Sequence, residues 1–115
     1  MKRALSHPGR LLKRELTARK LSANRLSLDI GVPSGGITDI LNAQRSITAD
    51  KAVRLGRYFG TIAFPGQVSS GWPKETRHLK IAQFWLDLQS QYDIAVVERE
   101  KGGEIAKRVR PADAA

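Results

Sequence analysis

The sequence has 115 residues, with 20 Lys or Arg against 11 Asp or Glu and a formal net charge of +9. This length suits one compact domain with short appendages, and the basic surplus favours an acidic partner, nucleic acid or an anionic surface, over solubility alone. The absence of cysteine excludes disulfides and thiolate chemistry, and no apolar run approaches the roughly 20 residues of a membrane span, so we expect a soluble cytoplasmic protein without membrane association.

A first amphipathic helix is predicted from Pro8, a residue that suits a first helical position. Its apolar residues recur at helical spacing between charged ones: Leu11, Leu12 and Leu16. Residues 1–7 form an N-terminal arm. Residues 1–20 carry seven Lys or Arg against Glu15 alone, so the basic face is mostly N-terminal.

A second helix is predicted after the capping residue Ser22, and Gly31 stops it in the position that favours a left-handed end. A third helix begins near Pro33 or Ser34 and ends in the polar loop that starts at Asn42. The apolar residues of this stretch are spaced to face inward: Leu26, Ile30, Val32, Ile37, Ile40 and Leu41.

Residues 23–42 therefore show a helix-turn-helix pattern. Two short helices that meet at a steep angle need a small residue where they touch, here Ser27, and a glycine at the corner, here Gly31. Buried apolar residues would hold the second of these helices on the core and leave its other face free for the major groove of DNA.

A fourth helix is predicted to open at Thr48 and to stop at Gly60. Its apolar residues lie on or near one face: Ala52, Val53, Leu55, Gly56 and Phe59. Residues 62–78 lack a sustained period and are predicted as an inserted loop. Residues 79–101 form the longest helix, for packing or dimerisation, and residues 102–115 a short helical piece or a loose tail.

Residues 8–61 resemble the helix-turn-helix DNA-binding domain of the Cro-like repressor family, which implies an all-α fold, a compact helical bundle. Three motifs look like those of the HigA antitoxins, also labelled VapI-like, of bacterial toxin-antitoxin modules: HPGRLLKREL, GVPSGGITDILNAQRSITADKAVRLGRYFGT and QFWLDLQSQYD. The resemblance implies a homodimer that binds double-stranded DNA at its own promoter as an autorepressor. It also implies a partner, a toxin of the HigB type that is a ribosome-dependent mRNA endonuclease.

By the same resemblance, the third helix turns five positions toward the DNA groove, with Pro33 and Gly36 beside them: Ser34, Gly35, Thr38, Asp39 and Asn42. Ser34 contacts DNA or caps the helix. Asp39 contacts a cytosine or pairs with a nearby Arg, and Asn42 contacts an adenine or caps the helix C-terminus.

The loop after the third helix and the start of the fourth suit phosphate binding, through Gln44, Arg45, Ser46 and Thr48. For Arg45 the alternative is an ordinary solvated charge. The basic residues of the first helix extend the electrostatic surface or are simply solvated: Arg10, Lys13, Arg14 and Lys20.

Two departures from the family pattern stand out. Many relatives have Arg or another long polar residue near Gly35 or Gly36, and each glycine costs the helix about 1 kcal/mol relative to Ala. Either the glycines let the backbone approach DNA closely, or base recognition lies elsewhere.

The second departure is the stretch between Thr61 and Phe84, which is longer than in relatives. It is a tolerated surface insertion or a partner-binding loop.

An enzyme is disfavoured, because His7 and His78 lie in polar, flexible stretches without spaced carboxylates, a phosphate loop or metal ligands. We expect no cofactor and no metal. Two alternatives to the antitoxin stay open. One is a free-standing helix-turn-helix repressor, and the other is a toxin-binding module whose DNA binding the glycine pair has weakened.

Overall fold

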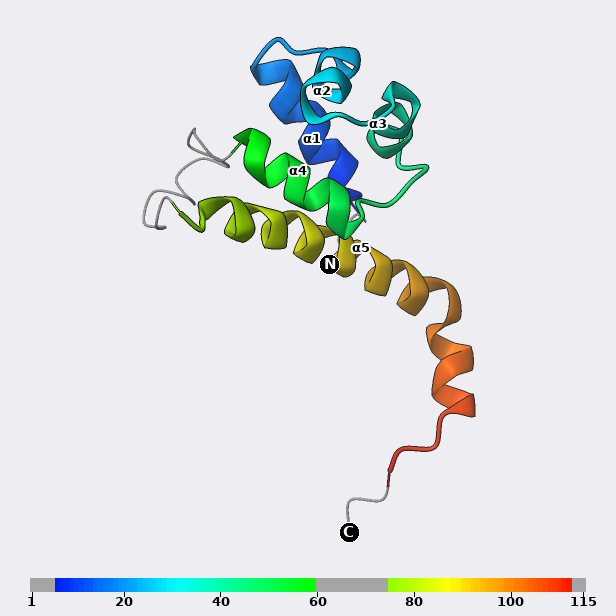
Figure 1. The fold of residues 1–115 in the computed structure, drawn as a ribbon. Helices are drawn as coiled ribbons and strands as arrows, with labels where there is room; N and C mark the ends of the chain where they lie inside the picture. Colours follow the sequence, from blue (N-terminus) through cyan, green and yellow to red (C-terminus); the bar gives the residue numbers. More distant parts are fainter. Residues whose placement is uncertain (1–5, 60–74, 113–115) are drawn as a thin grey trace.

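The computed structural model describes residues 6–59 and 75–112, and these residues form five helices and no strand. In chain order the helices are α1 (Pro8–Ala18), α2 (Ala23–Ile30), α3 (Ser34–Leu41), α4 (Ala49–Phe59) and α5 (Arg77–Arg108). Helices α1 to α4 gather into one body, and the first half of α5 runs along α4 (Figure 1). The all-α prediction is confirmed.

The helix starts agree with the predicted capping residues. The Ser22 Oγ accepts a hydrogen bond from the Arg25 N–H at 3.0 Å, and the Thr48 Oγ1 accepts one from the Lys51 N–H at 3.3 Å. Pro8 is the first residue of α1. These positions satisfy or remove backbone donors that the first turn of a helix leaves without partners.

The corner between α2 and α3 has the predicted geometry. Gly31 adopts φ 73°, in the left-handed region that favours glycine, and its N–H donates to the Ser27 carbonyl. Ser27 is buried, and its hydroxyl donates to the Asn24 carbonyl at 2.7 Å. Three residues, Gly31 to Pro33, thus connect α2 to α3.

The core lies between all five helices, α1 to α5. Its largest fully buried side chains are Trp85, Phe59, Leu12, Leu26, Ile37, Ile40, Leu55 and Ile81. Helices α4 and α5 cross closely at Gly56, where a Cβ would lie 2.2 Å from the His78 carbonyl oxygen. Only a glycine permits this approach, which brings Trp85 of α5 into the core.

Helix α5 corrects two predicted boundaries. It begins at Arg77, inside the predicted loop 62–78, and it continues to Arg108 instead of stopping at residue 101. The helix passes through Gly102 and Gly103 because the surrounding residues are mainly strong helix formers, which offset the cost of the glycines. Most of the predicted loop, with Phe64 and Trp72, and most of the N-terminal arm lie outside the described residues.

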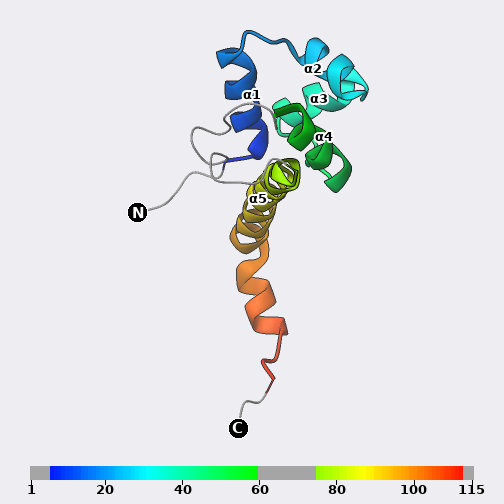
Figure 2. The ribbon, with the colours of Figure 1, turned by 60° about the vertical axis from the view of Figure 1, so that its left-hand side comes forward.

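The second half of α5 extends away from the body (Figures 1 and 2). Within the described part of α5, Gln89 is the last buried residue. Beyond it, several apolar side chains are exposed: Ile94, Val97, Ile105 and Val109. No helix in residues 6–59 or 75–112 combines the length and the apolar character needed to cross a membrane.

Candidate nucleic-acid interface

Helix α3 separates its apolar and polar residues as the sequence pattern predicts. Ile37 and Ile40 are buried and hold α3 against the core. Of the five predicted groove-facing residues, Asp39 is half-buried and four are exposed: Ser34, Gly35, Thr38 and Asn42. The structure therefore places these five residues together on the outer side of α3.

The ends of α3 decide two of the open alternatives. Pro33 occupies the N-cap position without a side-chain cap bond, and Ser34 is already the first helical residue, so the capping role for Ser34 is wrong. Asn42 is the C-cap residue, and its backbone N–H donates to the Thr38 carbonyl at 3.0 Å. Because the cap uses the backbone, the Asn42 amide is left for another partner.

Asp39 and Arg45 form an ion pair from α3 to the following loop. The Arg45 Nη2 lies 3.2 Å from the Asp39 Oδ2, and the two side chains are 55% and 44% exposed. Asp39 was predicted either to contact a cytosine or to pair with a nearby Arg, and the structure contains the pair with Arg45. Arg45 is not an isolated loop charge, but its exposed guanidinium retains donors that can meet a phosphate.

Residues 42–48 connect α3 to α4 and include the predicted phosphate contacts. Gln44 is exposed, and its Nε2 donates to the Asn42 carbonyl at 3.4 Å. Ile47 is buried, and its N–H donates to the Gln89 Oε1 on α5 at 2.8 Å. The hydrogen bond from Ile47 thus attaches the loop to α5, while Gln44 and Thr48 face solvent.

His7 also supports this loop, and its prediction as a residue of a flexible polar stretch is wrong. The side chain is 6% exposed, its Nδ1 accepts the Gly9 N–H at 2.9 Å, and its ring meets Tyr92 edge-on at 4.9 Å. Burial lowers the pKa of His7, and the Asp93 charge and a hydrogen bond with the Arg45 backbone oppose this in part. The position directly before a helix-starting proline is the sequence signal for this cap.

A basic groove of about 700 Å³ lies between α1 and the end of α3. Its lining combines cations with a small apolar floor: Arg10, Lys13, Arg14, Thr17, Ala18 and Leu41. Among the described residues, none of these three cations forms an ion pair within 4 Å with a carboxylate. One flank of α3 therefore carries uncompensated positive charge.

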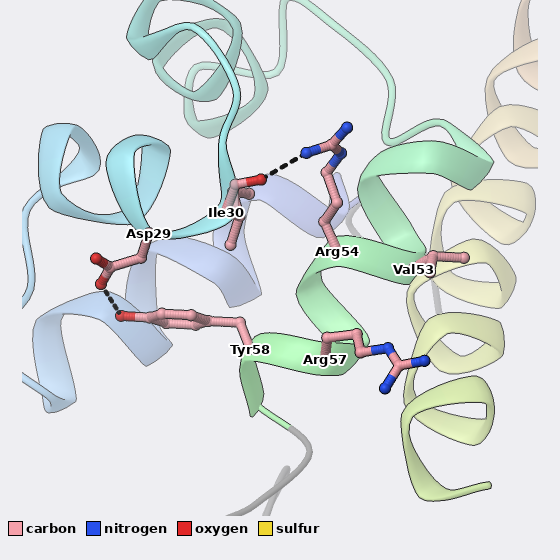
Figure 3. A pocket seen from close by; sticks show the side chains of 6 residues that line it. All are labelled: Asp29, Ile30, Val53, Arg54, Arg57 and Tyr58. Atoms are coloured by element: carbon pink, nitrogen blue, oxygen red, sulfur yellow. Dashed lines mark hydrogen bonds between the residues drawn. The ribbon is translucent and has the colours of Figure 1, made fainter.

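A second hollow, of about 450 Å³, lies between α2 and α4 (Figure 3). There the Arg54 Nη1 donates to the Ile30 carbonyl at 2.7 Å, and the Tyr58 hydroxyl donates to Asp29 at 2.9 Å. Hydrogen bonds from Arg25 and Tyr58 lower the pKa of Asp29. Most polar groups of this hollow thus bind one another. Their hydrogen bonds connect α2 with α4 and so position the helix-turn-helix.

The described residues hold no group of three or more His, Cys, Asp or Glu side chains that would suit a metal ion. The predicted interface instead consists of α3, the loop to α4 and the basic flank. It contains hydrogen-bond donors, cations and exposed backbone, which are the groups that bind phosphates and base edges.

No family model matches the sequence. Virulence-associated protein I of Dichelobacter nodosus is 36% identical over 96 residues, which cover 83% of this chain and 71% of that protein. The structure is similar to an addiction module antidote protein of the HigA family from Coxiella burnetii, with 37% identity, a TM-score of 0.73, and 95% and 99% of the two chains covered. It is also similar to the Pseudomonas aeruginosa antitoxin HigA in a structure with the higBA promoter, with 32% identity, a TM-score of 0.74, and 96% and 100% of the chains covered. This identity over nearly full length, with the helix-turn-helix intact, shows that the chain belongs to the HigA family of antitoxins.

Proposed function

We propose that this antitoxin binds the promoter of its own operon through α3, represses that operon, and neutralises a HigB-type mRNA endonuclease as a homodimer. The observation that carries the DNA-binding part is the outer side of α3, where polar and glycine residues are exposed above a buried apolar side. The related antitoxin from P. aeruginosa was solved with the higBA promoter, and this supports the same type of target here.

Base contacts would come from the side chains of Ser34, Thr38 and Asn42, which are exposed and carry hydrogen-bond donors and acceptors that pair with base edges. Phosphate contacts would come from Arg45 in the loop after α3 and from the basic groove between α1 and the end of α3. Cations beside a helix in the major groove can meet the DNA backbone, which gives affinity and fixes orientation.

The projecting half of α5 supports the homodimer. Ile94, Val97 and Ile105 recur at spacings of three and eight residues, which places them on one side of the helix, and all are exposed. A second copy of α5 would cover this apolar side. Two helix-turn-helix units are then available for two half-sites about 34 Å apart.

The DNA-binding proposal is tested by measuring Kd for a duplex taken from upstream of the gene and for a scrambled duplex of equal length, at about 150 mM salt. We expect the promoter duplex to bind at least about 100-fold more tightly. The double variant Thr38→Ala, Asn42→Ala should reduce this preference. Equal affinity of the wild-type protein for both duplexes would contradict operator recognition.

The toxin-neutralising proposal is tested by co-expression with the adjacent reading frame. The neighbouring protein alone should arrest growth, and the antitoxin should restore growth and co-purify with it. If the neighbouring protein is harmless and does not co-purify, while the promoter is still bound, the protein is a free-standing repressor.

A further inference from the structure

The two glycines at the start of α3 have different surroundings. A Cβ at Gly35 would have no atom within 4 Å, whereas a Cβ at Gly36 would lie 3.7 Å from the Cε of Lys51. The end of the Lys51 side chain therefore lies over Gly36, although Lys51 belongs to α4. A long cationic side chain thus stands next to α3 although α3 itself carries none.

The charge of Lys51 is not neutralised within the described part of the chain. The two carboxylates of α3 and α4 pair with arginines: Asp39 with Arg45 at 3.2 Å and Asp50 with Arg54 at 2.9 Å. No ion pair joins Lys51 to a carboxylate of residues 6–59 or 75–112 within 4 Å. Its ammonium group is available to an external anion.

The position of Lys51 raises the local positive potential further. Lys51 lies in the first turn of α4, and the end of its side chain lies beside Gly36 in the first turn of α3. The N-terminal end of a helix carries partial positive charge, so a cation beside two such ends is unfavourable without an anion. A phosphate placed there would offset the repulsion and would also meet the ammonium group.

We propose that Lys51 binds a phosphate of the DNA strand that runs along the α4 side of α3, and that Gly36 provides the space for its side chain. This inference rests on the proposed binding of DNA through α3. It also explains the glycine. A long side chain at position 36 would displace the Lys51 side chain. Lys51 on α4 then supplies the cationic contact with DNA that α3 itself lacks.

The test compares the wild-type protein with Lys51→Met and Lys51→Arg by titrating the promoter duplex and the scrambled duplex at several salt concentrations. Lys51→Met should weaken binding to both duplexes about fivefold to tenfold and reduce the slope of log Kd against log salt by about one, as expected for one phosphate contact. Lys51→Arg should retain the affinity. The matched control is Lys80→Met, which removes the same charge from the first turn of α5. The start of α5 lies away from α3 (Figure 1).

Substitutions at Gly36 test whether the Lys51 side chain needs the space beside this glycine. Gly36→Ala should keep the affinity, since its Cβ makes an ordinary contact with Lys51, whereas Gly36→Leu should lose as much affinity as Lys51→Met. Combined with Lys51→Met, Gly36→Leu should cause no further loss. Circular dichroism checks that each variant is folded.

The role of Lys51 is overturned if Lys51→Met binds both duplexes as the wild type does, or if its loss of affinity is confined to the promoter duplex. A wild-type protein that binds neither duplex would instead overturn the proposed function itself. The two failures are distinguished by the wild-type titration, which is measured first.

Discussion

The Gln89 side chain on α5 accepts a hydrogen bond from the Ile47 backbone N–H at 2.8 Å, and both residues are buried. The Gln89 Nε2 in turn donates to the Asp93 Oδ1 at 3.0 Å. Ile47 lies in the loop that carries Arg45, two residues after it. The helix with the exposed apolar side therefore also fixes the loop predicted to bind phosphate, so that the proposed partner surface on α5 and the proposed DNA interface on α3 lie on connected parts of the molecule.

We expect Gln89→Leu to lower the free energy of unfolding by about 1–3 kcal/mol, because the buried Ile47 N–H loses its acceptor. The loop should also become less well ordered, and binding of the promoter and scrambled duplexes should weaken together. Urea unfolding and duplex titration measure the two effects.

The matched control for Gln89 is Gln83→Leu on the same helix. Gln83 is exposed, and its Nε2 donates to the Asp87 Oδ1, one turn away, at 2.8 Å. Its replacement should change the free energy of unfolding by no more than about 0.5 kcal/mol. Equal effects of the two substitutions would show that the bond to Ile47 contributes nothing measurable.

His7 should make the stability pH-dependent. Burial lowers the pKa of His7 below its ordinary value of 6.5 in the folded protein. Between the folded and unfolded pKa values the unfolded chain binds more protons, so the free energy of unfolding decreases as the pH falls through about 6.5. The decrease ends below the folded pKa, where both states are protonated. Urea unfolding over this range measures it.

His7→Asn is the diagnostic variant, because Asn keeps a capping acceptor but cannot titrate. It should remove the loss of stability that begins near pH 6.5. The matched control is His78→Asn, which replaces a half-exposed histidine on α5 that forms no helix cap. If both variants follow the wild-type curve, the buried imidazole is not the titrating group.

The fold was largely predictable because local signals and apolar periodicity agree. Ser22, Gly31 and Thr48 mark helix ends by their own side-chain and backbone chemistry, and the structure has the ends there. The roles of His7 and Gln89 were not predictable, since each depends on residues far away in the sequence. Likewise, the different surroundings of Gly35 and Gly36 depend on where α4 packs, which periodicity within α3 does not specify.

Ala43→Gly should stabilise the protein. Ala43 has φ 60°, in the left-handed region that costs a residue with a Cβ about 1 kcal/mol or more. Glycine removes this strain but loses more entropy on folding, so we expect a net gain of about 0.5 kcal/mol in urea unfolding. Ala49→Gly, at a helical position of α4, should instead lower the stability. A loss of similar size in both variants would contradict the strain at position 43.

Asp39→Asn separates the two roles considered for Asp39. Without the carboxylate, Arg45 loses its ion pair and the interface loses a negative charge, so both duplexes should bind about threefold to tenfold more tightly. The control Asp87→Asn changes the same charge on α5, away from α3, and should have a smaller effect. Weaker binding of the promoter duplex alone would instead indicate that Asp39 contacts a cytosine.

Gly35→Arg tests whether α3 lies in the DNA groove. A Cβ at Gly35 meets no atom within 4 Å, so Arg fits without displacing a neighbour. It adds about 1 kcal/mol of helix propensity and a long donor on the outer side of α3. We expect tighter DNA binding, with a new preference for guanine at one position, because Arg pairs with the guanine edge in two hydrogen bonds. A library of duplexes randomised at single positions measures the preference.

Gly103→Arg is the matched control for Gly35→Arg. A Cβ at Gly103 also has no neighbour within 4 Å, but Gly103 lies on the half of α5 that projects from the body. It receives the same charge and the same gain in helix propensity, so it separates these general effects from contact with a base. If Gly35→Arg changes affinity no more than Gly103→Arg does and creates no base preference, α3 does not enter the groove. In that case DNA recognition through this helix is wrong for the protein, whatever its family.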